Sequence, residues 1–145
     1  MKNDPIVKEV LLDAPLEQVW KAITDKKEMK QWYFDMSDFK PEKGFEFSFE
    51  GRNEAENKTF VHLCKVTDVI EKKKLAYSWR YKDLPGMTLV TFELFPDGSN
   101  TRLRLTHEGI ESLAPGGPDF DKKNFVEGWN AIIGKNLPGH LEKTR

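Results

Sequence analysis

The stretch FVEGWNAIIGKNLPGHL, residues 125–141, spaces large apolar side chains three and four positions apart. This series consists of Phe125, Trp129, Ile132, Ile133, Leu137 and Leu141. Such spacing is typical of an amphipathic helix whose apolar stripe is buried against a larger surface. Pro138 interrupts the series, because proline lacks an N–H and its ring clashes with the carbonyl of Gly134, at a cost of about 3 kcal/mol inside a helix. We therefore expect a long C-terminal helix that kinks or ends early near residues 134–139.

The middle of the chain predicts the surface that this helix needs, because there the apolar period changes from 3.6 to 2. In FEFSFEG, residues 45–51, three phenylalanines alternate with polar side chains, as in a half-buried strand. Four more strands are expected at residues 59–70, 75–81, 87–95 and 101–109. Short turn sequences such as EKKK and PDGSN separate several of them, so we expect an antiparallel meander.

The chain before residue 45 predicts one further strand and two short helices. IVKEVLL, residues 6–12, is rich in branched side chains and indicates the strand. A helical stripe follows, made of Leu16, Val19, Trp20 and Ile23. Pro15 suits the first turn of this helix, with Asp13 as the nearest capping residue, and Asp25 with Glu28 fits a capping box that opens the second helix. With the meander and the C-terminal helix, this order predicts an α+β fold.

Composition narrows the functional classes. The 145 residues are the usual size of one domain, and 23 basic against 24 acidic residues give a net charge of −1, without the basic face that a nucleic-acid binder needs. Cys64 is the one cysteine, which suits a reducing compartment. No apolar run reaches signal-peptide length or the roughly 20 residues of a membrane span. We expect one domain in the cytoplasm, with no nucleic-acid partner and no membrane span.

Four segments, taken in order, resemble a known family. They are DAPLEQVWKAITD with MKQWYF, then VTDVIEKKKLAYSW, then TRLRLTHEG, then FVEGWNAIIGKNL. The chain resembles the START-like helix-grip (SRPBCC) superfamily, and within it the proteins homologous to the C-terminal domain of the activator of Hsp90 ATPase. The match spans nearly all of residues 1–145. It implies a curved antiparallel sheet of about six strands wrapped around a long C-terminal helix, with two short helices after the first strand.

Members of this superfamily commonly hold a hydrophobic cavity between sheet and helix. Strand parity and helical spacing select the side chains that would line it here. These are Trp20, Trp32, Phe45, Phe47, His62, Tyr77, Trp79, Tyr81, Phe92, His107, Phe125, Trp129 and Ile133. Apolar walls with a few polar points, here His62, Tyr81 and His107, are typical of a small-molecule site. The opposite interpretation is that these aromatic side chains simply fill the core. The strand at residues 59–70 is ambiguous, since both of its faces carry apolar side chains.

Little in the sequence indicates catalysis or metal binding. His107 and Glu108 are adjacent on a strand, so they point to opposite faces and cannot form a dyad. Neither a nucleophile motif nor a glycine-rich phosphate loop is present. His62 and Cys64, two positions apart, could join His107 as zinc ligands, but cysteine is often a small buried apolar residue. We predict no catalytic residue, no metal and no cofactor.

The function predicted from these observations is a non-enzymatic START-like domain that binds an apolar or amphipathic small molecule between sheet and C-terminal helix. Two alternatives stay open. The first is a chaperone-associated interaction module with a filled core, although the eukaryotic co-chaperone has an additional N-terminal domain with no counterpart here. The second is a cyclase-like or hydrolase-like enzyme that uses His62, His107 or Tyr81. An exposed strand edge leaves both a monomer and a homodimer open.

Overall fold

The computed structural model describes residues 4–53 and 57–143. The elements, in chain order, are β1 Ile6–Leu12, α1 Leu16–Thr24, α2 Lys26–Trp32, β2 Glu46–Asn53, β3 Lys58–Ile70, β4 Lys74–Tyr81, β5 Thr88–Asp97 and β6 Asn100–Glu108, then the 3₁₀-helices η1 Ile110–Gly116 and η2 Pro118–Phe120, and then α3 Lys122–Ala131, the π-helix η3 Ile132–Asn136 and α4 Leu137–Lys143. The predicted α+β order of strands and helices is confirmed.

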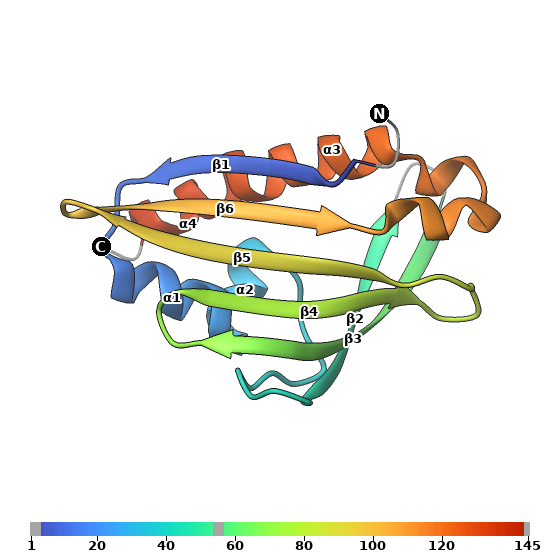
Figure 1. Cartoon of the computed structure of the whole chain (residues 1–145), viewed down its shortest axis with the longest axis horizontal. Coiled ribbons are helices and arrows are strands. Elements are labelled where there is room, and N and C mark those ends of the chain that lie inside the picture. The colour runs from blue at the N-terminus through green and yellow to red at the C-terminus, as the bar shows by residue number, and fades with distance from the viewer. Residues whose placement is uncertain (1–3, 54–56, 144–145) are drawn as a thin grey trace.

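The strands form a six-stranded antiparallel sheet in the order β1-β6-β5-β4-β3-β2. The sheet is curved, and the C-terminal helical segments run behind it in the view of Figure 1, with α1 and α2 beside them. Strands β2 to β6 are a meander, and β1 returns to pair with β6. The expected helix-grip arrangement, with the sheet wrapped around the last helix, is therefore observed.

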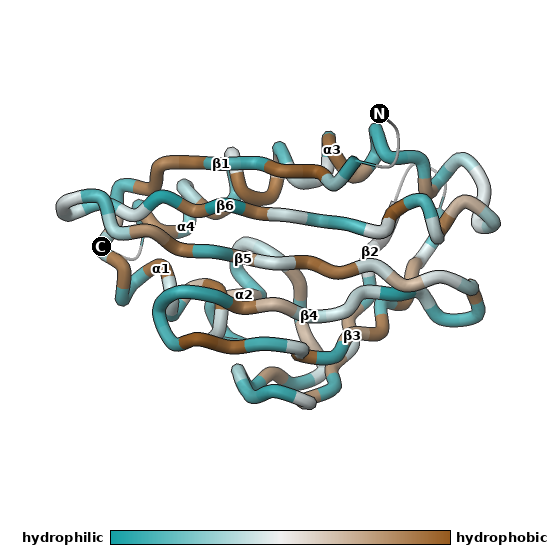
Figure 2. The backbone as a smooth tube through the Cα atoms, viewed as in Figure 1, coloured by the Kyte–Doolittle hydropathy of each residue, from teal (hydrophilic) through white to brown (hydrophobic). Residues whose placement is uncertain are grey.

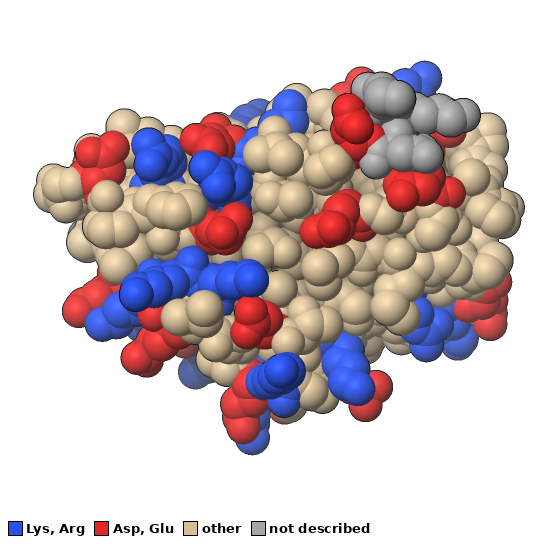
Figure 3. Space-filling model, in the orientation of Figure 1, with Lys and Arg blue, Asp and Glu red and all other residues tan. Residues whose placement is uncertain are grey.

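Buried and exposed residues alternate along most strands, which gives the sheet one buried and one exposed face. Figure 2 shows polar and apolar residues mixed along each strand. The ambiguous strand β3 turns His62, Cys64 and Val66 inward, while Lys65 is exposed. On the outer face, acidic and basic side chains are interspersed (Figure 3), and Glu9 of β1 binds Arg104 of β6 at 2.8 Å. The outer face therefore stays solvated while the inner face supplies the core.

The two short helices lie where the sequence predicts them, but their N-terminal caps differ from the predicted ones. Helix α1 begins after Pro15, which itself occupies the N-cap position, so the expected cap by Asp13 is wrong. At α2 the Asp25 carboxylate accepts hydrogen bonds from the backbone N–H groups of Lys27 and Glu28, as expected. The capping box is incomplete, since the Glu28 carboxylate instead lies 3.0 Å from His140 Nε2 on α4. This contact joins α2 to the end of the chain.

The C-terminal helix is long but irregular. It continues past Pro138 to Lys143, so an early end near residues 134–139 is wrong. The departure from α-helical geometry lies just before the proline, in the π-helix η3, where the N–H of Leu137 donates to the carbonyl of Ile132. A π segment moves backbone hydrogen bonds from four to five residues apart, which lets the chain accommodate a residue without an N–H.

Candidate ligand pocket

The centre of the space between sheet and helix is filled by an aromatic side chain from the N-terminal part of the chain. The Tyr33 ring, directly after α2, lies 6.1 Å from Trp129 of α3 and 6.3 Å from Phe92 of β5. Its hydroxyl lies 2.7 Å from the hydroxyl of Tyr77, within hydrogen-bonding distance. Burial raises the pKa of both phenols well above the usual value, so both stay protonated at neutral pH.

A hydrogen-bonded chain connects the helix to the sheet beside this centre. Trp129 Nε1–H donates to His107 Nδ1 at 3.0 Å, which makes Nδ1 the acceptor and leaves the proton on Nε2. His107 Nε2 lies 2.8 Å from the hydroxyl of Thr88, which donates to the carbonyl of Trp79. Burial, with a smaller contribution from His62, lowers the pKa of His107 to about 3. Both ring nitrogens are occupied, so His107 has a structural role and no lone pair for proton transfer.

An open pocket remains at one end of the grip, where β2, β3 and β4 meet η2 and α3. Its volume is about 260 Å³. The lining residues are Phe34, Gly51, Phe60, His62, Tyr81, Asp119, Phe120, Asn124 and Phe125. Five of these side chains carry the aromatic ring of Phe or Tyr, and few polar groups lie among them. This is the composition expected of a small-molecule site.

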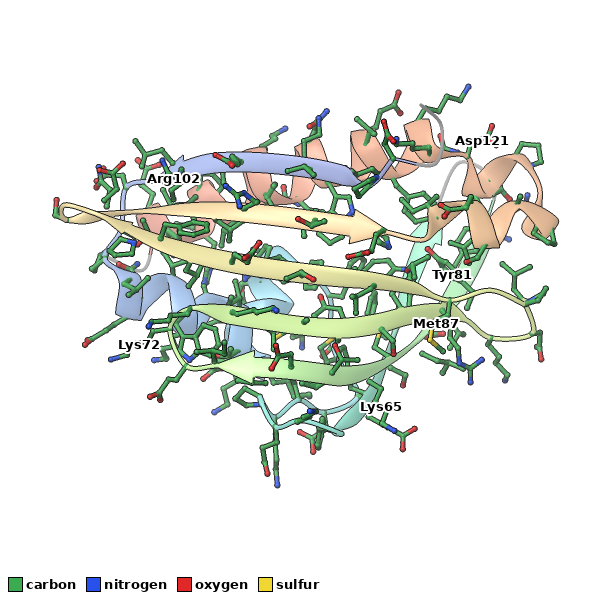
Figure 4. All side chains as sticks on the ribbon, in the orientation of Figure 1. Lys65, Lys72, Tyr81, Met87, Arg102 and Asp121 are labelled. Carbon is green, nitrogen blue, oxygen red and sulfur yellow. The ribbon has the colours of Figure 1, made fainter. Side chains whose placement is uncertain are left out.

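The 3₁₀-helix η2 forms one wall of the pocket through Phe120. The Phe120 ring lies 4.7 Å from Tyr81 and 5.7 Å from Phe60, both edge to face. Lys58 at the beginning of β3 binds Asp119 at 3.0 Å and holds η2 against the sheet. Figure 4 shows Tyr81 at the same end of the molecule as Asp121, which precedes α3. The pocket is thus closed on one side by a short segment attached through one surface ion pair and two ring contacts.

His62 lies between the pocket and the core. Its ring stacks on Phe49 at 4.3 Å, and Nδ1 lies 3.3 Å from the Phe49 carbonyl, which can only accept, so Nδ1 carries the proton. Burial lowers the pKa of His62 to about 4, although the backbone carbonyls of Phe49 and Phe60 act in the opposite direction. His62 is therefore neutral at neutral pH.

The predicted lining residues divide into a pocket group and a core group. His62, Tyr81 and Phe125 line the pocket. The buried core contains Trp20, Trp32, Phe47, Tyr77, Trp79, Phe92, His107, Trp129 and Ile133, and Phe45 packs against it half-buried. The other lining residues were not in the predicted lining set, although the aromatic cluster of residues 32–34 suggests a closure of the pocket end; they are Phe34, Gly51, Phe60, Asp119, Phe120 and Asn124. Strand parity with His62 could have identified Phe60, but nothing local indicates that Phe120 closes the pocket.

Among residues 4–53 and 57–143, no group of three or more His, Cys, Asp or Glu side chains is arranged to hold a metal ion. Cys64 is buried, and burial raises the pKa of its thiol. Asp35 is exposed and pairs with Lys26 and Lys30. None of the described helices combines the length and apolar character needed to cross a membrane.

Comparisons with known proteins agree with this architecture. The family model described as Activator of Hsp90 ATPase homolog 1-like protein matches residues 13–142. Protein CV1439 of Chromobacterium violaceum is 23% identical with a TM-score of 0.81, over 98% of this chain and 99% of that one. Protein MLL2253 of Mesorhizobium loti is 25% identical with a TM-score of 0.72, over 97% and 98%. No curated protein matches the sequence.

A third similar structure belongs to a longer protein. DynU16, from the dynemicin biosynthetic locus, is 21% identical with a TM-score of 0.79 over 98% of this chain. The chain spans about half of that protein, since the alignment covers 48% of it. At this identity the likeness shows the shared fold and nothing about activity.

Proposed function

Because the chain belongs to the family of Activator of Hsp90 ATPase homolog 1-like proteins, with a helix-grip fold, we propose that it binds a small apolar molecule in the pocket between β2–β4, η2 and α3. One observation carries the proposal. The pocket has aromatic walls with a small number of polar groups, and it lies at one end of the packed core. The function is binding, without chemical change of the ligand.

The dimensions of the pocket narrow the ligand class. Drug-sized ligand sites usually measure about 300–1,000 Å³, and this pocket of about 260 Å³ lies just below that range. A compact ligand of one or two rings fits this space, whereas a long acyl chain would need the centre that Tyr33 occupies. Burial of apolar ligand surface contributes about 25 cal/mol per Å² before the costs of association, so micromolar affinity is a reasonable expectation.

The first test is native mass spectrometry of the purified protein, followed by denaturing extraction of any bound molecule. The second is calorimetric titration with naphthalene, an uncharged two-ring probe. Phe60→Trp enlarges a lining side chain and is expected to weaken naphthalene binding at least tenfold. Met87→Trp is the matched control, because Met87 is 56% exposed and lies outside the pocket. Absence of both a bound molecule and naphthalene binding to the wild type would refute the proposal.

A second candidate is the interaction module, and the filled centre of the grip favours it. The half-buried Tyr33 ring lies within 6.3 Å of the rings of Phe49, Phe92 and Trp129, so it occupies space between sheet and helix that a lipid chain would need. The name of the family refers to activation of the Hsp90 ATPase. This candidate predicts that the purified chain stimulates ATP hydrolysis by Hsp90 in a concentration-dependent manner, while Phe60→Trp leaves that stimulation unchanged.

A further inference from the structure

Most polar side chains of the pocket already have a partner, which limits the hydrogen-bond donors that are available to a ligand. Asp119 is paired with Lys58 at 3.0 Å. The two N–H bonds of the Asn124 amide are used, since Nδ2 donates to the carbonyls of Pro118 at 3.0 Å and Asp119 at 3.2 Å. His62 Nδ1–H donates to a backbone carbonyl. The hydroxyl of Tyr81 is therefore the side-chain donor of the pocket that these bonds leave available.

The surroundings of Tyr81 add a second observation. Trp79 lies two residues earlier on the same face of β4, and the two rings are 6.4 Å apart. Trp79 is 4% exposed, and its indole N–H is the one fully buried side-chain polar atom without a hydrogen-bond partner among the described residues. Burial raises the pKa of the Tyr81 phenol, and the nearby Trp79 side chain acts in the opposite direction. The phenol is therefore protonated at neutral pH and can act as a hydrogen-bond donor.

The pocket also favours an uncharged ligand. Its one acidic side chain, Asp119, is already paired with Lys58, no Lys or Arg is among the lining residues, and His62 is neutral at neutral pH. A ligand carboxylate would meet aromatic walls and the Asp119 carboxylate without a positive partner, so its loss of hydration would not be compensated. A neutral acceptor, such as a carbonyl oxygen, avoids this cost.

We propose that Tyr81 donates a hydrogen bond to the carbonyl of a neutral aromatic ketone or ester bound in the pocket. This inference rests on the proposed binding function and specifies the ligand class. Tyr81 orients the ligand by its carbonyl, and the rings of Phe60, Phe120 and Phe125 contact the aromatic part.

The test compares two ligands of nearly the same shape, 2-acetylnaphthalene and 2-isopropenylnaphthalene, of which only the first carries a carbonyl. Wild-type protein is expected to bind the acetyl compound about tenfold more tightly in calorimetric titration. Tyr81→Phe is expected to bind both equally, at the wild-type affinity for the isopropenyl compound. Tyr33→Phe is the matched control and keeps the difference, because the Tyr33 hydroxyl is bound to Tyr77 instead.

An infrared measurement gives an independent readout. The acetyl carbonyl stretch of the bound ligand should lie at lower frequency in the wild-type complex than in the Tyr81→Phe complex. Equal affinities of the wild type for both ligands, or a difference that survives in Tyr81→Phe, would overturn the inference while leaving pocket binding intact. Failure of the wild type to bind either ligand would instead refute the proposed function, and this inference with it.

Discussion

Replacement of His107 by leucine tests the buried chain of hydrogen bonds from Trp129 to Trp79. In the wild type, His107 accepts from Trp129 Nε1–H and bonds to Thr88. His107→Leu leaves the Trp129 N–H buried and unpaired, which costs about 1–3 kcal/mol of unfolding free energy at pH 7.5. The same substitution also removes a titrating group, so it should change the pH dependence of stability as well.

The sign of that pH dependence follows from the lowered pKa values. The pKa of His107 is about 3 and that of His62 about 4 in the folded protein, against an ordinary histidine pKa of 6.5. At pH values between the folded and the unfolded pKa, the unfolded chain binds more protons than the folded chain. The contribution of each histidine to stability is therefore complete above about pH 6.5 and is lost as the pH falls toward its pKa in the folded protein. From pH 7.5 to pH 5 each histidine removes about 2 kcal/mol, hence about 4 kcal/mol in the wild type and about 2 in His107→Leu.

The assay is urea unfolding at pH 7.5 and pH 5, followed by tryptophan fluorescence and circular dichroism. Trp129→Phe is the control, because it breaks the same hydrogen-bonded chain but keeps His107, so its loss of stability between the two pH values should stay close to that of the wild type. If His107→Leu lost as much stability on acidification as the wild type, the buried neutral histidine would not be the cause and the reasoning would be refuted.

Three further predictions concern single positions. Asp25→Ala should lower the unfolding free energy by about 1 kcal/mol in urea denaturation, because it removes both side-chain hydrogen bonds that cap α2. Asp25→Asn should keep most of the wild-type unfolding free energy, because asparagine also caps helices. Gly86→Ala should cost at least about 1–2 kcal/mol, because Gly86 has φ +106° and an added Cβ would collide with the Ser112 carbonyl; an unchanged melting temperature would contradict this. Cys64 should react with a thiol reagent only on unfolding, since burial disfavours its thiolate; rapid labelling of the native protein would contradict its burial.

Much of the fold could be predicted because the signals are local. The alternation in residues 45–51 and the three- and four-residue spacing in residues 125–141 each report which side of one element is buried. The cap at Asp25 likewise depends on only four consecutive residues, 25–28. The outcome at Pro138 was different, because whether a helix ends or shifts to π geometry depends on the packing that holds the next turn.

The sequence by itself determined the order of strands and helices, the inward faces of most strands, and the aromatic character of the interior, because periodicity and side-chain chemistry belong to each segment alone. Only the tertiary structure decided where space remains. Tyr33 enters the centre of the grip, while Phe120, some sixty residues from Phe60 along the chain, closes a pocket with it at one end. A cavity is the difference between the volume that the backbone encloses and the volume that all side chains fill, and that difference is not a property of any one segment.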